Sequence, residues 1–245
     1  MSMSCAPTSP RPWLAAVLAI AGVSALAPAH AHQVWLENAG GQARLHFGEF
    51  NDNLRETSPG RLDQFKGVPV LEQQRTGAPA QRVDGQLGKD AFVYATTGTP
   101  DTLFATPTYP VIDRSKRNLP AMYWQPAARW VASLAKPVAP TAALDLVPTG
   151  KPGQLKVVFH GAPLPKAKVE LVSPSGWARE ATSGDDGTVT FALPWKGQYV
   201  AEVKHSDKTP GEAQGQKYGE VSHLITLSFV QAEGMASPAL PAGHA

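Results

Sequence analysis

Three histidines in this sequence occupy positions where they could bind a metal ion: His32, His205 and His223. The first follows Ala-His-Ala at residues 29–31, a small-residue pattern typical of signal-peptide cleavage. Removal of residues 1–31 would make His32 the first residue of the working protein. Its free α-amine and its ring Nδ1 could then close a chelate ring on one ion, and imidazole nitrogen suits copper, nickel and zinc.

The first 31 residues have the composition of a secretory signal. Met1 and Arg11 provide positive charge at the start, and a short apolar run covers residues 13–27. We therefore expect residues 1–31 to be a signal peptide and the mature protein to work in a bacterial periplasm. The single cysteine, Cys5, lies in this segment, so we expect no disulfide and no thiolate ligand in the mature protein.

The other two histidines end apolar rows on two successive predicted strands, residues 198–205 and 221–230. The two rows share one face only if odd-numbered residues oppose odd-numbered ones, and the best such register sets His205 opposite His223. Directly opposed Cβ atoms lie about 4.5–5.5 Å apart, so the two imidazoles could share one ion. We predict that His32 joins this pair around one divalent ion. The alternative is two half-buried histidines hydrogen-bonded to the intervening loop.

The remaining candidate groups are less specific. Asp207 could orient a histidine from outside the ligand set, or cap its own turn. His160 ends a predicted strand on the face opposite to its apolar row and is a weaker ligand candidate. His46 alternates with apolar residues, so we expect it to face solvent. His244 lies in a Pro/Ala-rich tail.

Composition limits the classes of partner. The formal net charge is only +2, so no basic face is indicated and nucleic acid is not an expected partner. No apolar run after the signal segment reaches the roughly 18 residues of a membrane-spanning helix. We therefore expect no membrane insertion of the mature chain.

The turn pattern predicts an all-β fold. The chain contains 22 glycines and 23 prolines, which fits short strands joined by many turns. We expect an N-terminal β domain at residues 32–138, a linker near residues 136–140 and a disordered tail at residues 232–245. Regularly spaced turns over residues 141–231 predict an immunoglobulin-like or transthyretin-like β-sandwich of about seven strands.

One segment differs from this pattern. Residues 119–134 carry apolar and aromatic side chains at mixed spacings, with Pro120 near the start. We predict one short helix with proline near its first position. Its aromatic residues indicate packing in a core, and a carbohydrate platform is the alternative.

Several segments resemble a family of bacterial periplasmic proteins that is classed as a domain of unknown function and is also described as a nickel uptake substrate-specific transmembrane region. The similar segments are residues 31–36 (Ala-His-Gln-Val-Trp-Leu), 161–169, 185–191 and 197–199, Tyr218, His223, and residues 226–229. The middle segments are also similar to carboxypeptidase-regulatory and transthyretin-like sandwiches.

The resemblance implies a periplasmic accessory to nickel or cobalt uptake. An inner-membrane metal transporter would then be the protein partner. Because Tyr218 belongs to the similar segments, we expect it to lie, with Asp207, around the ligands His32, His205 and His223.

Three functions are therefore compared. The first is a metal-binding protein for nickel, cobalt or copper. The second is a non-enzymatic β-sandwich module that binds a glycan or a protein through Trp124, Trp130 or Trp177. The third, an oxidative copper enzyme with an N-terminal histidine, has the least support, since the sequence has no Gly-x-Ser-x-Gly, His-Glu-x-x-His or phosphate-loop pattern. We expect the protein not to be an enzyme.

Overall fold

The computed structural model describes residues 1–2 and 32–240. Contacts between Cα atoms divide the chain into two units, Met1–His30 and Ala31–Ala245, and the second unit carries the fold described below. The expected signal peptide lies outside the described residues except for its first two residues. His244 also lies outside them.

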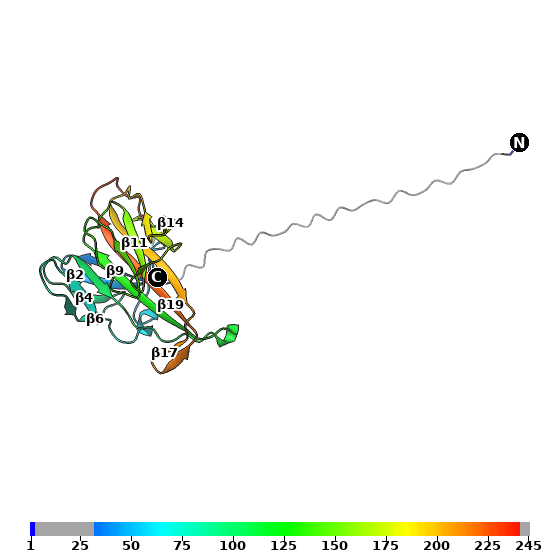
Figure 1. Ribbon diagram of the computed structural model, residues 1–245, viewed down its shortest axis with the longest axis horizontal. Helices are drawn as coiled ribbons and strands as arrows, with labels where there is room; N and C mark the ends of the chain where they lie inside the picture. Colours follow the sequence, from blue (N-terminus) through cyan, green and yellow to red (C-terminus); the bar gives the residue numbers. More distant parts are fainter. Residues whose placement is uncertain (3–31, 241–245) are drawn as a thin grey trace. The chain divides into compact units, whose positions relative to one another are not determined.

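The second unit is all-β, as predicted, and consists of three sheets and a small hairpin (Figure 1). The first sheet contains β1 (Gln33–Ala39), β2 (Gln42–Glu49), β3 (Leu54–Arg55), β6 (Gly85–Leu87) and β7 (Phe92–Ala95). The central sheet contains, in spatial order, β14 (Ala178–Thr182), β13 (Lys168–Val172), β16 (Gly197–Asp207), β19 (Glu220–Gln231), β9 (Met122–Val131), β8 (Thr102–Ala105), β4 (Leu71–Gln74) and β5 (Gln81–Val83). The third sheet contains β10 (Leu144–Pro148), β11 (Gln154–Phe159), β12 (Ala162–Pro163) and β15 (Thr188–Thr190). The hairpin is β17 (Gly211–Ala213) with β18 (Gln216–Tyr218), and two 3₁₀ turns cover Arg61–Gln64 and Ser115–Arg117.

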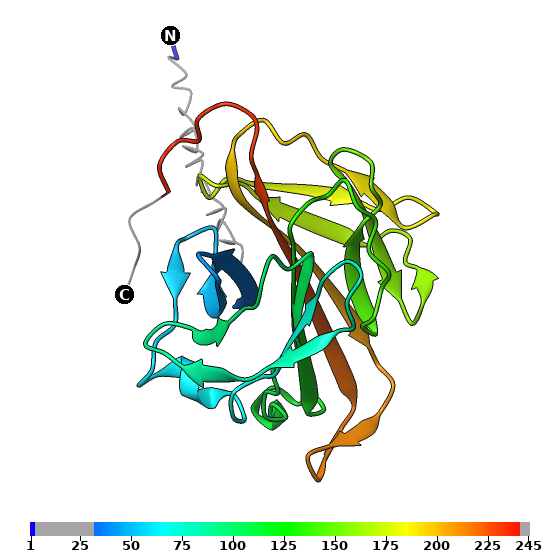
Figure 2. The same cartoon turned by 90° about the vertical axis from the view of Figure 1, so that its left-hand side faces the viewer.

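The central sheet is covered on both faces. Odd-numbered residues of β16 and β19 pack in one core with the third sheet, whereas Leu224 packs in a second core with the first sheet. Thr226 also donates a hydrogen bond of 2.6 Å to the carbonyl oxygen of Val34, which ties β19 to β1. In Figure 2 the blue first sheet and the yellow-green β10 and β11 accordingly lie on opposite sides of the orange-red β19.

The predicted pairing of the two histidine strands is confirmed. β16 and β19 pair antiparallel, with His205 opposite His223. The same register sets Tyr199 opposite Phe229, and their rings stack at a centroid distance of 5.5 Å. The matching of the two apolar rows therefore determines this register.

The helix predicted over residues 119–134 is wrong, because Met122–Val131 forms strand β9. β9 runs parallel to β19 at the middle of the central sheet (Figure 1). Most of this strand is buried on both faces, so its apolar residues do not alternate with polar ones and the period of two is lost. Pro126 is tolerated because β8 pairs only with residues 128–131, which leaves one side of β9 unpaired at the proline.

The central sheet crosses the boundary expected between residues 138 and 141. β8 and β9 precede that boundary, whereas β13, β16 and β19 follow it.

A buried ion pair joins the two sides of that boundary. Arg129 on β9 binds Asp145 on β10 with Nη2–Oδ2 and Nε–Oδ1 distances of 2.6 and 3.1 Å. Both side chains are almost fully excluded from solvent. The guanidinium group also lies 4.7 Å from the centre of the Phe104 ring. The two halves of the chain are therefore joined by both hydrogen-bonded strands and paired charges.

Two further expectations differ from the structure. His46 is buried rather than exposed to solvent: its ring stacks on Trp35 and its Nδ1 lies 3.0 Å from the carbonyl oxygen of Asp90. Within the expected disordered tail, Met235 is hydrogen-bonded to the fold: its N–H donates to the Pro194 carbonyl at 2.9 Å. In both cases contacts remote in sequence decide the outcome.

Candidate metal centre

His32 lies directly before β1, and its ring is held between two carboxylates. Its Nε2 lies 2.5 Å from Oε1 of Glu56, and its Nδ1 lies 3.3 Å from Oε1 of Glu49. The side chains of all three residues are between 15 and 20 % exposed. Phe47 packs against the imidazole at a centroid distance of 5.0 Å. The ring is therefore oriented by the folded protein and remains accessible to an ion.

A tight turn brings the two carboxylates together. Glu49 ends β2 and Leu54 begins β3, and these two residues pair directly across the turn. The N–H of Glu56 then donates to the carbonyl oxygen of Phe47 at 2.8 Å. Gly48 is required for this approach, because a Cβ atom there would lie 2.2 Å from the Leu54 carbonyl oxygen. The return of β3 along β2 thus places one carboxylate at each ring nitrogen of His32.

A second group of histidines lies where β16 ends and β19 begins. His205 is half-buried and His223 is buried, and the ring of Phe159 lies 4.4 Å and 5.3 Å from their ring centres. Burial lowers the pKa of His223; Asp207 opposes this shift, whereas His205 and His160 add to it. His223 is therefore predominantly neutral at neutral pH and able to donate a nitrogen lone pair.

His160 joins this group through an unusual turn. β11 and β12 are connected by the two residues His160 and Gly161, which have φ values of +48° and +79°. A positive φ at both positions is typical of a type I′ hairpin turn, and it aims the His160 ring toward His223 at a centroid distance of 6.4 Å. The alternation of side chains along β11 predicted the wrong face for His160. The strand ends at Phe159, and the alternation no longer holds in the turn that begins at His160. The His-Gly pair is the signal that could have revealed it.

His32 does not lie with His205 and His223. The cleft beside His32 is lined by Lys204 and Leu224, which alternate with the two histidines along β16 and β19. Successive side chains of a strand point to opposite faces, so the central sheet stands between His32 and the histidine pair. One ion therefore cannot contact all three of these side chains.

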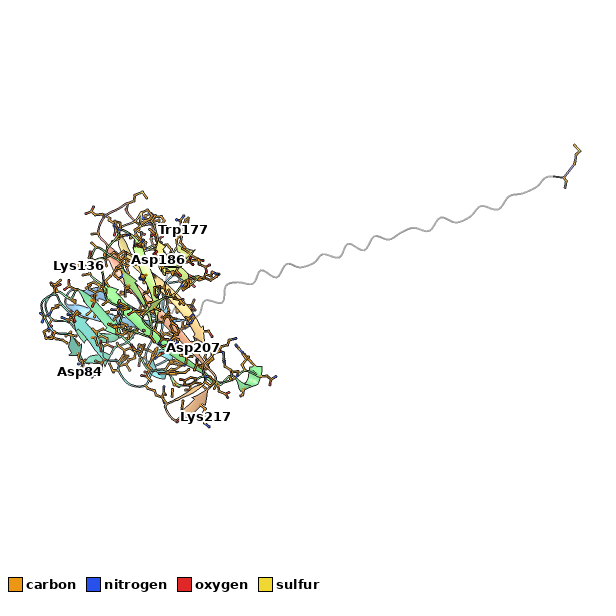
Figure 3. The ribbon with its side chains drawn as sticks, viewed as in Figure 1. Asp84, Lys136, Trp177, Asp186, Asp207 and Lys217 are labelled. Atoms are coloured by element: carbon orange, nitrogen blue, oxygen red, sulfur yellow. The ribbon has the colours of Figure 1, made fainter. Side chains whose placement is uncertain are left out.

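The two residues expected around the ligands have different positions. Asp207 lies near His223 and His160, and its hydrogen bonds from Thr209 are the main cause of its lowered pKa, with both histidines contributing. Figure 3 labels Asp207 near the end of the central sheet that leads to the β17–β18 hairpin. Tyr218 stacks on Tyr123 at 5.6 Å instead. Within the described residues Tyr218 has no ring contact or hydrogen bond with a histidine.

Among residues 32–240 no three side chains of His, Cys, Asp or Glu already converge as a complete metal site. The His32 group has one imidazole and two carboxylates on opposite edges of the ring, and the His160 group has three imidazoles around Phe159.

A small aromatic cleft opens beside His32, with a volume of about 310 Å³. Its wall includes Phe47, Tyr109 and Trp124, whose rings contact one another at centroid distances of 5.1 to 6.4 Å. Trp124 is thus part of a packed aromatic wall rather than an open platform. Trp130 is buried, whereas Trp177 is 73 % exposed and touches Trp195 edge-on.

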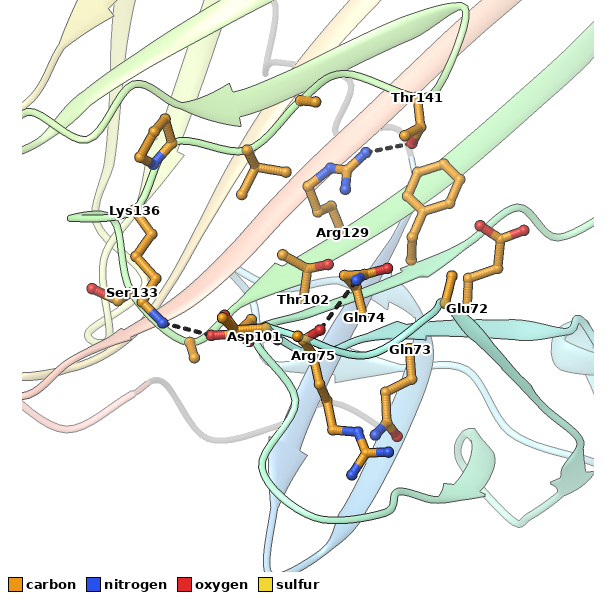
Figure 4. A pocket seen from close by; sticks show the side chains of 18 residues that line it. Glu72, Gln73, Gln74, Arg75, Asp101, Thr102, Arg129, Ser133, Lys136 and Thr141 are labelled. Carbon is orange, nitrogen blue, oxygen red and sulfur yellow. Dashed lines mark hydrogen bonds and ion pairs between the residues drawn. The ribbon is translucent and has the colours of Figure 1, made fainter.

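A larger cleft of about 470 Å³ lies between β4, β8 and the segment after β9 (Figure 4). Its charged groups include two that are already paired: Lys136 Nζ lies 2.8 Å from Asp101, and Arg129 is bound by Thr141 and Asp145. Its size alone does not indicate a reaction.

Comparison with known proteins gives a limited result. A family model described as a domain of unknown function (DUF4198) matches residues 134–207, which covers β10 to β16. No curated protein matches the chain. None of the helices in the described residues is long and apolar enough to cross a membrane.

Proposed function

We propose that the protein is an exported metal-binding protein that holds a divalent transition-metal ion at His32 once residues 1–31 have been removed. The observation that carries the proposal is the pair of carboxylates on the two ring nitrogens of His32. The missing donor would be the α-amine that processing creates. Because the α-amine belongs to the main chain, the proposed site does not need a third ligating side chain.

The geometry of the ring supports this assignment. Metal-binding histidines commonly donate their other ring N–H to a carboxylate, which fixes the tautomer. Glu56 is suitably placed to accept that proton from Nε2, and the lone pair of Nδ1 would then face Glu49. Arg61 Nη1 also lies 3.1 Å from Nε2 and 3.7 Å from Glu56, so its positive charge reinforces the ionised state of Glu56. Two donors that each lie about 2.0–2.2 Å from one ion are about 3 Å apart when their bonds are roughly perpendicular. The 3.3 Å between Nδ1 of His32 and Oε1 of Glu49 fits that requirement.

The donor set suggests which metals would bind. An amine nitrogen, an imidazole nitrogen and one carboxylate oxygen suit copper and nickel, and copper has the greater intrinsic affinity. The resemblance of the N-terminal segment to nickel-uptake proteins favours nickel or cobalt. We propose accordingly an accessory role in transition-metal uptake in the periplasm, with an inner-membrane transporter as the receiving partner. The partial exposure of His32 would allow the ion to be exchanged.

The alternative function is a module that binds a protein or a glycan without a metal. The exposed Trp177, in contact with Trp195, is the observation that favours it. In Figure 3 Trp177 lies far from the hairpin that carries Lys217. Alanine at Trp177 would remove partner binding under this alternative and would leave metal affinity unchanged.

Two measurements test the proposal. Mass spectrometry of the exported protein should find His32 at the N-terminus. Calorimetry with Ni²⁺ and Cu²⁺ should then show one tight binding event at His32, and this event should be lost when one extra residue precedes His32, whether or not metal binds elsewhere in the protein. Glu49→Gln and Glu56→Gln should each weaken binding by about 10- to 100-fold.

The exposed Glu212 provides the matched control. Glu212→Gln removes one negative charge on the β17–β18 hairpin and should leave the affinity unchanged. Equal affinity with and without the extra N-terminal residue would overturn the proposed site.

A further inference from the structure

We infer that His160, His205 and His223 form a second metal site, composed only of imidazole ligands, on the opposite face of the central sheet from His32. The inference does not rest on the proposed function, because it needs neither processing nor a free α-amine. The ligand would be a divalent transition-metal ion that prefers nitrogen, such as zinc or copper.

The cross-strand pair is the foundation of this site. His205 and His223 are directly opposed in the antiparallel register, so their Cβ atoms lie about 4.5–5.5 Å apart on one face. Both imidazoles contact the ring of Phe159, at centroid distances of 4.4 and 5.3 Å. Two imidazoles on this spacing can reach one ion without a change in the backbone.

His160 supplies the third imidazole. The positive φ at His160 is a conformation that few side-chain-bearing residues adopt, and the hydrogen bond of 2.7 Å from its N–H to the Ala143 carbonyl helps to hold the turn there. Its side chain is exposed, so a rotation about its side-chain bonds is not blocked by a packed core. The separation of 6.4 Å between its ring centre and that of His223 can be closed by this rotation.

The ring nitrogens in this group are available. Among the described residues none forms a hydrogen bond to a ring nitrogen of His160, His205 or His223, whereas both nitrogens of His32 and one of His46 face oxygen atoms. The buried His223 and its two more accessible neighbours therefore present ring nitrogens that are open to an external partner.

The surroundings also favour a cation. Asp207 lies close enough to His160 and His223 to share in their electrostatic interactions, and it would offset part of the charge of an ion. His223 also lines a cleft of about 170 Å³.

The experiment uses full-length mature protein with one extra residue before His32, which removes the α-amine donor of the first site. Calorimetric titration with Zn²⁺ at pH 7.5 should show one ion bound per chain. His205→Asn should abolish this binding, and His160→Ala should weaken it by at least about tenfold. Lowering the pH through about 6 should release the ion, because protonated imidazole is not a ligand.

The control is Glu212→Gln, a substitution at an exposed carboxylate on the β17–β18 hairpin, which should leave zinc binding at this cluster unchanged. Because His160 is exposed, His160→Ala should keep the far-UV circular dichroism of the parent and so separates loss of a ligand from loss of the fold. Zinc affinity that is unchanged in both His205→Asn and His160→Ala would overturn the inference. A processed protein that binds metal only when His32 is free would overturn it too, while leaving the first site intact.

Discussion

At the scale of single residues, the neighbours of each imidazole decide its role. His32 has carboxylates on both ring edges, whereas His46 is enclosed by Trp35, the carbonyl of Asp90 and Glu37. The identity of a histidine does not reveal this difference. The pairing of His205 with His223 could therefore be predicted from the sequence, because it depends on strand periodicity alone. The burial of His46 could not, because the residues that bury it are remote in sequence.

Glu37 gives a testable consequence of that enclosure. Burial alone would raise its pKa, but the His46 imidazole 3.7 Å away, the hydrogen bond from Trp35 and the charge of Arg55 lower the pKa to about 2. A carboxylate with a lowered pKa stabilises the folded state fully above its unfolded pKa, near 4.5, and loses that contribution as the pH falls toward 2. We expect Glu37→Gln to reduce stability at pH 7 by on the order of 1–3 kcal/mol.

The measurement is urea denaturation of parent and variant between pH 2.5 and 7. The difference between the two free energies of unfolding should shrink as the pH falls below 4.5. A difference that stays constant across this range would show that the charge of Glu37 is not the source of the stabilisation.

At the scale of elements, the β2–β3 turn holds the His32 site together. A Cβ atom at Gly48, where φ is +147°, would lie 2.2 Å from a backbone oxygen, and the backbone must move to accommodate it. We expect Gly48→Ala to destabilise the protein by more than about 2 kcal/mol and to weaken metal binding at His32 by separating Glu49 from Glu56.

Gly41 is the matched control for this prediction. It also has a positive φ, +75°, but no atom lies within 4 Å of the point that an alanine methyl group would occupy there. Gly41→Ala should therefore cost only the backbone strain of about 1–2 kcal/mol and leave metal affinity unchanged. Equal effects of the two substitutions on metal affinity would contradict the role assigned to the turn.

Elements also mark the limit of inference from sequence. The antiparallel pairing of β16 with β19 could be predicted because two neighbouring strands must match their apolar rows. The parallel pairing of β9 with β19 could not, since the partners lie far apart in the chain and β9 is buried on both faces. The placement of His32 on the other face of the sheet could not be predicted either, because it depends on how the first sheet packs against β19.

At the scale of the whole molecule, the Arg129–Asp145 pair links the central and third sheets. Removal of one partner leaves a buried charge without compensation, so Asp145→Asn should reduce the free energy of unfolding by about 3–5 kcal/mol. The exposed pair of Lys136 and Asp101 is the comparison, and Lys136→Met should change stability little. A small effect of Asp145→Asn in chemical denaturation would show that the pair is replaceable.

The shared central sheet also predicts how residues 32–240 unfold. Because strands from both sides of residue 140 pair within it, we expect one cooperative transition. Tryptophan fluorescence and far-UV circular dichroism should report the same midpoint in urea. Two separated midpoints would instead indicate halves that fold independently.

The position of β19 has a consequence for the order of events during synthesis. This strand pairs with both β16 and β9 and packs on β1, yet it follows all three in the chain and is synthesised after them. Contacts between residues so distant in the chain form slowly. A growing chain that has not reached Glu220 lacks the strand that β9 and β16 share as a partner, so we expect the central sheet to form only after residues 220–231 have been synthesised.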